Sequence, residues 1–343
     1  MALIPDALLR EYPGSGFAGA SRRGNKWKHE VQGWTHENGS KITSNSLFDL
    51  ASLTKVVATL PLCLVLLNRG ELNLNQKINH YVSNAGWFQD QSLGDVEVFK
   101  LFNHTSGLPA WKPLFAYSNS SSVLKANVLQ TNLMEPVIRC YSDLGWIVLG
   151  HLVERITQSK LDQLAKEWVF GPLGMTSTGF KPLETYERIQ CVATEDCGWR
   201  KELLHGTVHD ENAHALGGIA GHAGLFSNLE DLIHYMNAWL NKLAVIGLEK
   251  EVEMVMNSKS ESEGLPAYGL GWRFAPSLEY SGFGNRSGAM GHTGYTGTSL
   301  WFDCHLQEAV ILLNNRVYPG RQNTDEVIQT FRERMHEHFL SPM

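Results

Sequence analysis

Hydrophobic and polar residues alternate in short runs near both ends of this chain. Residues 16–21 and 29–34 are two such runs, separated by the polar sequence 22–26. Residues 299–303 and 309–313 are two more, separated by a short polar turn. Short runs of β-forming residues bounded by turn residues are typical of paired strands. The pattern therefore predicts one sheet that takes strands from both ends of the chain.

Between and after these strands, apolar residues recur at the spacing of one helix face. The pattern predicts helices over four ranges, 53–67, 144–156, 229–243 and 325–338. Pro61 lies inside the first range and should kink that helix or cost it a backbone hydrogen bond. Ser142 or Asp143 can cap the start of the second helix.

Strands at both ends with helices between them favour an α/β (α+β) fold, an antiparallel sheet flanked by helices. We expect residues 1–70 and 216–343 to form the sheet domain and residues 71–215 to form a mainly helical insertion domain. A cleft between two such parts is a common place for a ligand site. The active site is therefore expected between them.

Length and composition are those of an ordinary globular protein. The 343 residues are 43% hydrophobic and 19% charged, with a net charge of −6 and no long run of Lys or Arg. Nucleic acid and anionic membrane are therefore not expected partners. No segment approaches about 18 uninterrupted apolar residues, so we expect no membrane-spanning segment. The sequence leaves the oligomeric state open.

The start of the chain shows no basic stretch followed by an apolar one, so no secretory signal is visible. This favours a cytoplasmic location, although a periplasmic or secreted protein trimmed of its leader would look the same. Five scattered cysteines argue against a disulfide framework. Cys191 and Cys197 could form a single bridge in an oxidising compartment.

The most informative chemistry is the sequence Ser52-Leu53-Thr54-Lys55 at the expected start of a helix. Three-residue spacing places the hydroxyl and the amine on one face, one turn apart. A desolvated amine there can be neutral near pH 7 and accept the hydroxyl proton, which makes Ser52 a nucleophile. The pattern alone is weak, because it occurs by chance in many chains.

Further segments strengthen the case because they occur in one order along the chain. They are Phe48-Asp49-Leu50-Ala51-Ser52-Leu53-Thr54-Lys55, Asn103-His104-Thr105-Ser106-Gly107-Leu108-Pro109, Tyr141-Ser142-Asp143-Leu144-Gly145, the glycine-rich stretch 217–227, and Gly291-His292-Thr293-Gly294-Tyr295-Thr296-Gly297. Together they resemble the serine hydrolases of the class C β-lactamase, D-alanyl carboxypeptidase and family VIII esterase group. The resemblance implies a β-lactamase/transpeptidase-like fold and a penicillin-binding-protein-like serine acyl hydrolase without cofactor or metal.

The resemblance also implies roles for individual residues. Ser52 would be acylated, and Lys55 with Tyr141 would handle the protons. The main-chain N–H groups of Ser52 and Tyr295 would form the oxyanion hole, where two fixed donors stabilise the tetrahedral intermediate. A further set of residues would contact the substrate, namely Asp143, His292, Thr293 and Gly294. Whether Tyr141 has a lowered pKa or acts as a proton shuttle is left open.

Two departures from the family pattern bear on the substrate. His292 stands where β-lactamases and carboxypeptidases usually carry Lys, a permanent cation for a substrate carboxylate. Asp143 stands where Asn is more common, and an ionised carboxylate only accepts hydrogen bonds. Both changes weaken the case for an efficient β-lactamase and leave room for an ester, an amide or a cell-wall-type peptide. If His292 bears charge, affinity for carboxylates should fall as it titrates.

Two hypotheses from other classes remain beside the hydrolase. A non-catalytic binding protein would lack one catalytic group, and no such group is missing here. A metal-dependent hydrolase could use His205, His209, His214 and His222. The spacing of these histidines matches no zinc-protease pattern, so a hydrogen-bonded loop at the cleft is favoured.

Overall fold

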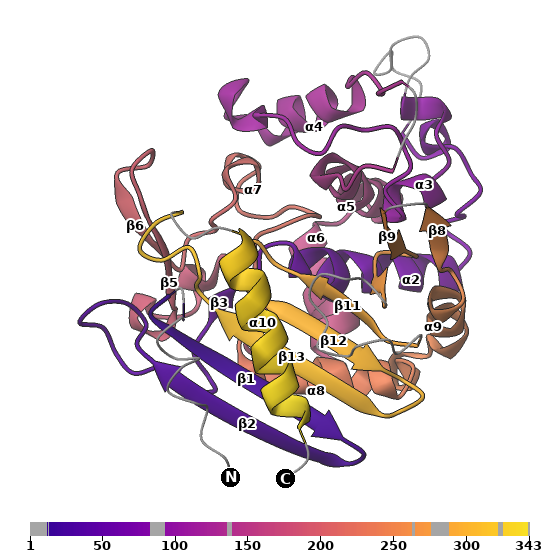
Figure 1. Cartoon of the computed structure of the whole chain (residues 1–343). Helices are drawn as coiled ribbons and strands as arrows, with labels where there is room; N and C mark the ends of the chain where they lie inside the picture. Colours follow the sequence, from indigo (N-terminus) through magenta and orange to yellow (C-terminus); the bar gives the residue numbers. More distant parts are fainter. Residues whose placement is uncertain are drawn as a thin grey trace.

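A large antiparallel sheet forms the base of the molecule in the computed structural model. The structure describes residues 12, 14–82, 93–135, 139–262, 265–275, 288–321 and 325–341. Eight described strands follow the spatial order β2-β1-β13-β12-β11-β10-β9-β8 (Figure 1). They are β1 (Gly16–Arg23), β2 (Lys26–Gly33), β8 (Ser260–Ser262), β9 (Leu265–Tyr268), β10 (Arg273–Phe274), β11 (Met290–Thr293), β12 (Ser299–Asp303) and β13 (Glu308–Asn314). Phe17 in β1 pairs with Asn314 in β13. The prediction of a sheet built from both ends is confirmed.

The helices of the described residues lie on both faces of this sheet and above it (Figure 1). They are α2 (Leu60–Asn68), α3 (Phe99–Phe102), α4 (Ser121–Leu129), α5 (Asp143–Thr157), α6 (Leu161–Leu164), α7 (Glu211–Ala215), α8 (Leu229–Leu240), α9 (Glu249–Met256) and α10 (Asp325–Leu340). The predicted helices at 144–156, 229–243 and 325–338 correspond to α5, α8 and α10. Ser142 caps α5, because its side chain accepts the Gly145 N–H.

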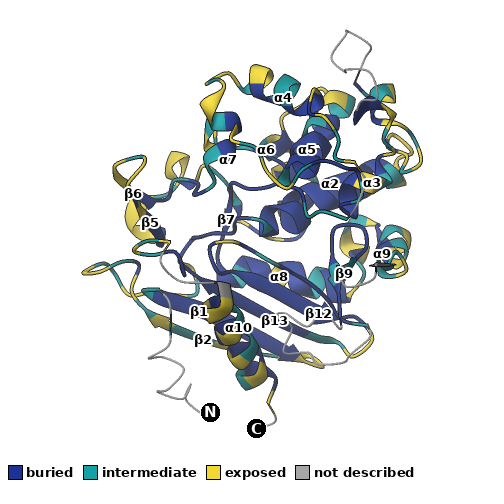
Figure 2. Cartoon of the chain, turned by 45° about the horizontal axis from the view of Figure 1, so that its top comes forward, coloured by how far each residue is buried: buried dark blue, intermediate teal, exposed yellow. Residues whose placement is uncertain are grey.

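Alternate residues of the central strands pack into two separate cores, as the two-residue period of a strand requires. On one face, Val310 and Leu312 contact the apolar side of α10. On the other face, Ile311 and Leu313 belong to the larger core that includes α8. Figure 2 shows these strands as buried along most of their length. The sheet is therefore a middle layer between two cores.

Smaller β-structures carry the segments around the site. Strands β3 (Phe48–Asp49), β7 (Leu225–Ser227) and β4 (Gly179–Phe180) form one short sheet, and β5 (Ala193–Cys197) pairs with β6 (Glu202–His205) in a projecting hairpin. The hydrophobic pattern did not predict these short strands, because alternation can be recognised only over longer runs. Residues 71–215 thus hold strands as well as helices, and the proposed domain boundaries remain a prediction.

The first helical segment differs from the single α-helix expected over 53–67. A π-helical turn spans Lys55–Thr59, in which the Leu60 N–H donates to the Lys55 carbonyl five residues back. Pro61, at the start of α2, has no N–H to continue the four-residue pattern. The wide turn accommodates the proline and sets the direction of Lys55. None of the helices in the described ranges is long and apolar enough to cross a bilayer.

Candidate active site

A buried carboxylate holds the segment before Ser52. Asp49 Oδ1 accepts the Ala51 N–H at 2.8 Å, and its Oδ2 accepts the His209 N–H at 2.7 Å. Ala51 has a φ of +46°, a left-handed conformation that is uncommon outside glycine. Such strain persists only where the surroundings fix it, as these hydrogen bonds do. Ser52 is thereby presented at the start of the helical segment.

Lys55 is completely buried, and its side-chain nitrogen has three acceptors. Nζ lies 2.7 Å from Ser52 Oγ, 2.7 Å from Asp143 Oδ1 and 3.2 Å from the His222 carbonyl oxygen. The contacts with Ser52 and His222 are hydrogen bonds, and the contact with Asp143 is an ion pair. One side chain therefore joins the nucleophile segment, the start of α5 and the stretch before β7.

These contacts revise the expected protonation of Lys55. Burial by itself lowers the pKa of the amine, but the Asp143 carboxylate and the Tyr141 hydroxyl outweigh burial, and the pKa of Lys55 is raised above its ordinary value. The free protein therefore holds an ammonium at neutral pH. The neutral amine expected from desolvation alone is wrong because the sequence does not show the Asp143 contact.

Tyr141 lies beside the same ammonium, with its ring centre 5.1 Å from Lys55 Nζ. Burial raises the pKa of the Tyr141 phenol; Lys55 and a hydrogen bond with Ser52 lower it without reversing the result. The phenol is therefore protonated at neutral pH. His104 accepts the Ser142 N–H through Nδ1 at 3.0 Å, and its ring centre lies 4.5 Å from that of Tyr141.

Strand β11 passes close to the nucleophile turn, and Gly294 permits this approach. A Cβ at position 294 would stand 2.5 Å from the Leu50 carbonyl oxygen and 2.2 Å from Thr298 Oγ1. The glycine is therefore required by backbone contact rather than by a positive φ. Thr293 precedes it and is half-buried at the same edge.

His292 is buried, and its Nδ1 lies 2.9 Å from the Thr293 carbonyl oxygen. Burial, followed by the positive charges of Lys55 and Arg273, holds the pKa of His292 well below its usual range. A protonated His292 that attracts carboxylates near neutral pH is therefore not expected in the free protein. This removes the predicted pH dependence of carboxylate affinity.

The two main-chain N–H groups predicted to form the oxyanion hole are available. Within the described part of the chain, neither Ser52 N nor Tyr295 N donates a hydrogen bond. The Tyr295 carbonyl oxygen instead accepts Arg316 Nε at 2.6 Å, which fixes the peptide from the other side. Unpaired donors on fixed backbone are the groups that an oxyanion requires.

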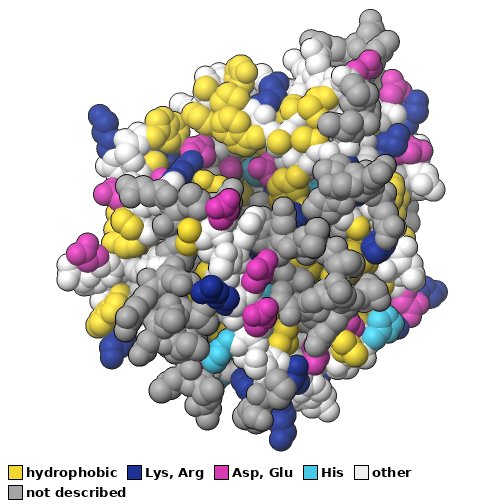
Figure 3. All heavy atoms as spheres, viewed as in Figure 1, with side chains coloured by type: hydrophobic (Ala, Val, Ile, Leu, Met, Phe, Trp, Pro, Cys, Tyr) yellow, Lys and Arg dark blue, Asp and Glu magenta, His cyan; other side chains and the backbone are white. Residues whose placement is uncertain are grey.

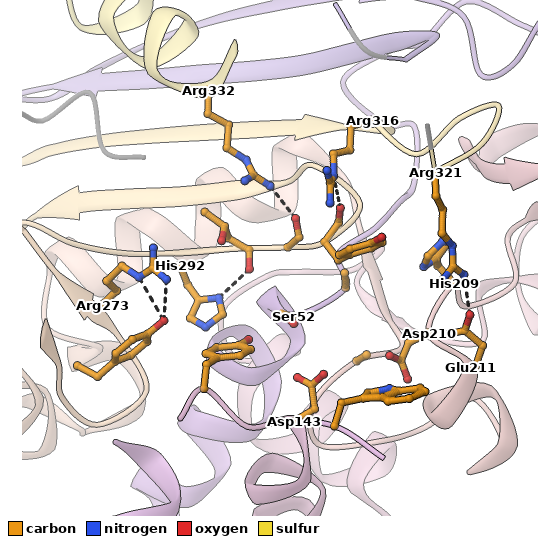
Figure 4. Close-up of a pocket in the computed structure, with 18 of the residues that line it drawn as sticks. Ser52, Asp143, His209, Asp210, Glu211, Arg273, His292, Arg316, Arg321 and Arg332 are labelled. Carbon is orange, nitrogen blue, oxygen red and sulfur yellow. Dashed lines mark hydrogen bonds and ion pairs between the residues drawn. The ribbon is translucent and has the colours of Figure 1, made fainter. Parts of the chain in front are cut away.

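Most of the residues chosen from the sequence meet at one cavity of about 610 Å³. Seven of the eight residues singled out from the sequence line it, namely Ser52, Tyr141, Asp143, His292, Thr293, Gly294 and Tyr295. The eighth, Lys55, is buried behind Ser52. Figure 4 shows Asp143 and His292 around Ser52, with Arg321 and Glu211 at the far end.

Several residues of this cavity were missed in the sequence. Arg273 donates to the Tyr268 hydroxyl, 2.8 Å from its Nη2, beside His292. Arg332 in α10 donates to the carbonyl oxygens of Gly294 and Gly297, and so braces the turn after β11. Isolated arginines distant in sequence carry no local signal. Only the fold brings them to the site.

Three of the four histidines considered as metal ligands have separate partners instead. His209 Nε2 lies 2.9 Å from Glu195, His222 Nε2 lies 2.9 Å from Asp210, and His205 Nε2 lies 2.7 Å from the Cys191 carbonyl oxygen. No group of three or more His, Cys, Asp or Glu that could hold a metal occurs in the described ranges. The five cysteines are free, so the Cys191–Cys197 bridge is not formed.

Comparison with known proteins identifies the family of the chain. The profile of the Beta-lactamase family matches residues 6–331. A protein of Escherichia coli O157:H7 named "Putative D-alanyl-D-alanine carboxypeptidase" is 31% identical over 309 residues, covering 80% of this chain and 70% of that protein. An N-acetylmuramyl-L-alanine amidase of Bacillus subtilis (strain 168) is 29% identical over 313 residues, covering 81% and 69%.

Solved structures show the same fold. A β-lactamase/D-alanine carboxypeptidase from Pseudomonas syringae superimposes with a TM-score of 0.74 at 19% identity, covering 98% of this chain and 97% of the other. A class C β-lactamase from Rhodobacter sphaeroides gives a TM-score of 0.74 at 16% identity, covering 97% of both chains. The chain therefore belongs to the Beta-lactamase family, and it is a serine hydrolase with the β-lactamase/transpeptidase-like fold.

Proposed function

We propose that this hydrolase cleaves an amide bond in a cell-wall peptide through an acyl-enzyme on Ser52. The observation that carries the proposal is the 2.7 Å contact between Ser52 Oγ and the buried Lys55 ammonium, at the wall of a cavity that Tyr141 also lines. Relatives named "Putative D-alanyl-D-alanine carboxypeptidase" and "N-acetylmuramyl-L-alanine amidase" support this substrate class.

The protonation states favour a proton shuttle through Tyr141. Ser52 Oγ attacks the substrate carbonyl carbon, and its proton passes to the Tyr141 oxygen. Tyr141 gives its own proton to the leaving nitrogen, so no strong base accumulates. The Lys55 ammonium stays protonated throughout and stabilises negative charge that develops on Ser52 Oγ. Water then hydrolyses the ester formed on Ser52.

The oxyanion of each tetrahedral intermediate would bind the N–H groups of Ser52 and Tyr295, which have no other acceptor among the described residues. Thr293 and Gly294 would face the substrate backbone along β11. Asp143 and His292 would contact it from either side of the nucleophile. Since Asp143 also pairs with Lys55, it serves chiefly to keep that ammonium charged and oriented.

Intact mass spectrometry tests the nucleophile directly. Incubation with a fluorophosphonate or a penicillin should add one equivalent of the probe to the wild type and none to Ser52→Ala. Wild-type protein that stays unmodified by both probes would contradict the proposal and favour a binding protein that keeps the fold.

Turnover assays test the substrate class. A D-Ala-D-Ala peptide, a muramoyl peptide, a short-chain nitrophenyl ester and nitrocefin should be compared at one enzyme concentration. We expect the cell-wall peptides to give the highest kcat/KM. Fastest hydrolysis of nitrocefin would instead identify an efficient β-lactamase, and fastest hydrolysis of the ester an esterase.

A further inference from the structure

Exposed aromatic side chains gather at one side of the cavity mouth. Trp111 and Phe115 line the cavity, and Trp199, at the end of the β5–β6 hairpin, lies with its ring centre 4.9 Å from that of Phe115. Trp111 is 44% exposed and Trp199 58% exposed. We call these three residues the aromatic rim. Figure 3 shows hydrophobic side chains gathered with acidic and basic ones in the upper half of this face.

Hydrogen bonds hold the Trp111 loop at a set place relative to the nucleophile. The Asp143 N–H donates to the Ala110 carbonyl oxygen at 2.9 Å, directly before Trp111. Asn212, fully buried in α7, accepts the Phe115 N–H at 3.2 Å and donates to the Lys112 carbonyl oxygen at 2.8 Å. A loop fixed at both ends keeps its large apolar side chains in water at a cost in free energy. Such exposure indicates a binding surface.

Charged side chains adjoin the rim. Glu211 pairs with Arg321 at 2.6 Å in the wall of the same cavity, and the Arg200 guanidinium lies 5.6 Å from the Trp199 ring centre. Tyr295, also exposed, has both Arg316 and His209 beside its ring and is not counted in the aromatic rim. Flat aromatic faces next to charged hydrogen-bonding groups suit a ligand with both C–H faces and hydroxyl edges. A pyranose ring has this chemistry, whereas an aliphatic chain offers no hydroxyl groups to Glu211 and Arg321.

We propose that the aromatic rim binds the sugar ring of a muramoyl peptide while the peptide lies across Ser52. The proposal rests on the proposed function, which places a cell-wall peptide in the cavity. Trp111 and Trp199 would stack on the ring, and Glu211 and Arg321 would meet its hydroxyl groups. The sugar contributes affinity, and the nucleophile is unaffected by it.

Binding to the non-hydrolysing Ser52→Ala protein tests the assignment independently of turnover. N-acetylmuramoyl-L-alanyl-D-glutamate and N-acetyl-L-alanyl-D-glutamate differ by the sugar and should be titrated by calorimetry. We expect the sugar to tighten binding by about tenfold or more, the effect of one stacked ring. Adding Trp111→Ala or Trp199→Ala should remove most of that ratio. Adding Trp34→Ala, which removes a 49% exposed tryptophan from outside the cavity lining, should leave it unchanged.

Three outcomes overturn the inference. The first is equal affinity for the two ligands, and the second is an affinity ratio between them that survives both rim substitutions. The third is an equal loss of affinity for both ligands in the rim variants, which would assign the rim to the peptide. Circular dichroism checks that each variant is folded. The mass-spectrometric adduct on wild-type Ser52 reports on the proposed chemistry alone, so failure of the sugar site and failure of the hydrolase proposal give different results.

Discussion

Replacing Asp143 with Asn tests whether the Lys55 ammonium is the active form. The substitution keeps the size of the side chain and removes a charge 2.7 Å from Lys55 Nζ. Coulomb's law gives about 1.5 kcal/mol for this pair in water and about 6 kcal/mol at an effective dielectric constant of about 20. The Lys55 side chain is fully buried and the Asp143 side chain is 20% exposed, so the larger end of that range is appropriate.

The direction in which Asp143→Asn should shift the pH dependence of Ser52 modification follows from the raised pKa of Lys55. In the wild type, Lys55 stays protonated up to high pH. The rate of Ser52 modification should therefore not fall in the alkaline part of the pH range. In Asp143→Asn the pKa of Lys55 falls. The alkaline loss of rate should then move to lower pH by at least one unit, since about 1.4 kcal/mol corresponds to one pH unit.

The assay is the second-order rate constant for fluorophosphonate modification from about pH 6 to 11, with Tm recorded at each pH. Asp95→Asn is a matched control, because Asp95 pairs with Lys77 at 2.8 Å but both side chains are more than half exposed. Such a pair is worth less than about 1 kcal/mol, so the profile should not move. A rate that rises in Asp143→Asn as Lys55 loses its proton would refute the reasoning and make the neutral amine the base.

Three further predictions concern the walls of the cavity. Gly294→Ala forces a Cβ to 2.5 Å from the Leu50 carbonyl oxygen. Urea denaturation should show that the free energy of unfolding falls by about 1–3 kcal/mol, and adduct formation on Ser52 should slow at least about tenfold. A variant as fast and as stable as the wild type would contradict the close approach. His292 stays neutral because its pKa is held low, so KM for a carboxylate substrate should be flat from about pH 5 to 8; a steep rise across that range would show a titrating histidine. Burial raises the pKa of Asp210, but His222 outweighs it and the net pKa is lowered, so Asp210 stabilises the fold above pH about 4 and progressively less below it. Asp210→Asn should therefore lower Tm at pH 7, and still lower it, though by less, at pH 3, because this stability is fully lost only below the lowered pKa of the folded state; an unchanged Tm at pH 7 would contradict a stabilising role of the carboxylate.

The catalytic segments could be predicted because their signals are local. A serine and a lysine three residues apart on a helix start, or a glycine after His292-Thr293, are visible within a few letters. The long strands and helices could be predicted for the same reason, because apolar residues repeat every two residues along a strand and every three to four along a helix. Seven of the eight chosen residues line one cavity as a result.

The protonation of the site could not be predicted, because it depends on contacts between distant segments. Lys55 and Asp143 are 88 positions apart and meet only in the fold. Arg332 reaches the Gly294 carbonyl oxygen from a helix 38 residues further along the chain, and Asn212 holds the Trp111 loop. The π-helical turn before Pro61 could not be predicted either, because the spacing of apolar residues does not distinguish it from an α-helix.

The position of β13 between β1 and β12 has a consequence for synthesis. A ribosome delivers the Ser52 segment early, but the strand that completes the central layer ends at Asn314. Until that strand emerges, β1 lacks one neighbour and the turn carrying Tyr295 has no β12–β13 support. A nascent polypeptide therefore carries an inert serine until residue 314 has left the ribosome, and hydrolytic competence cannot arise before β13 joins the sheet.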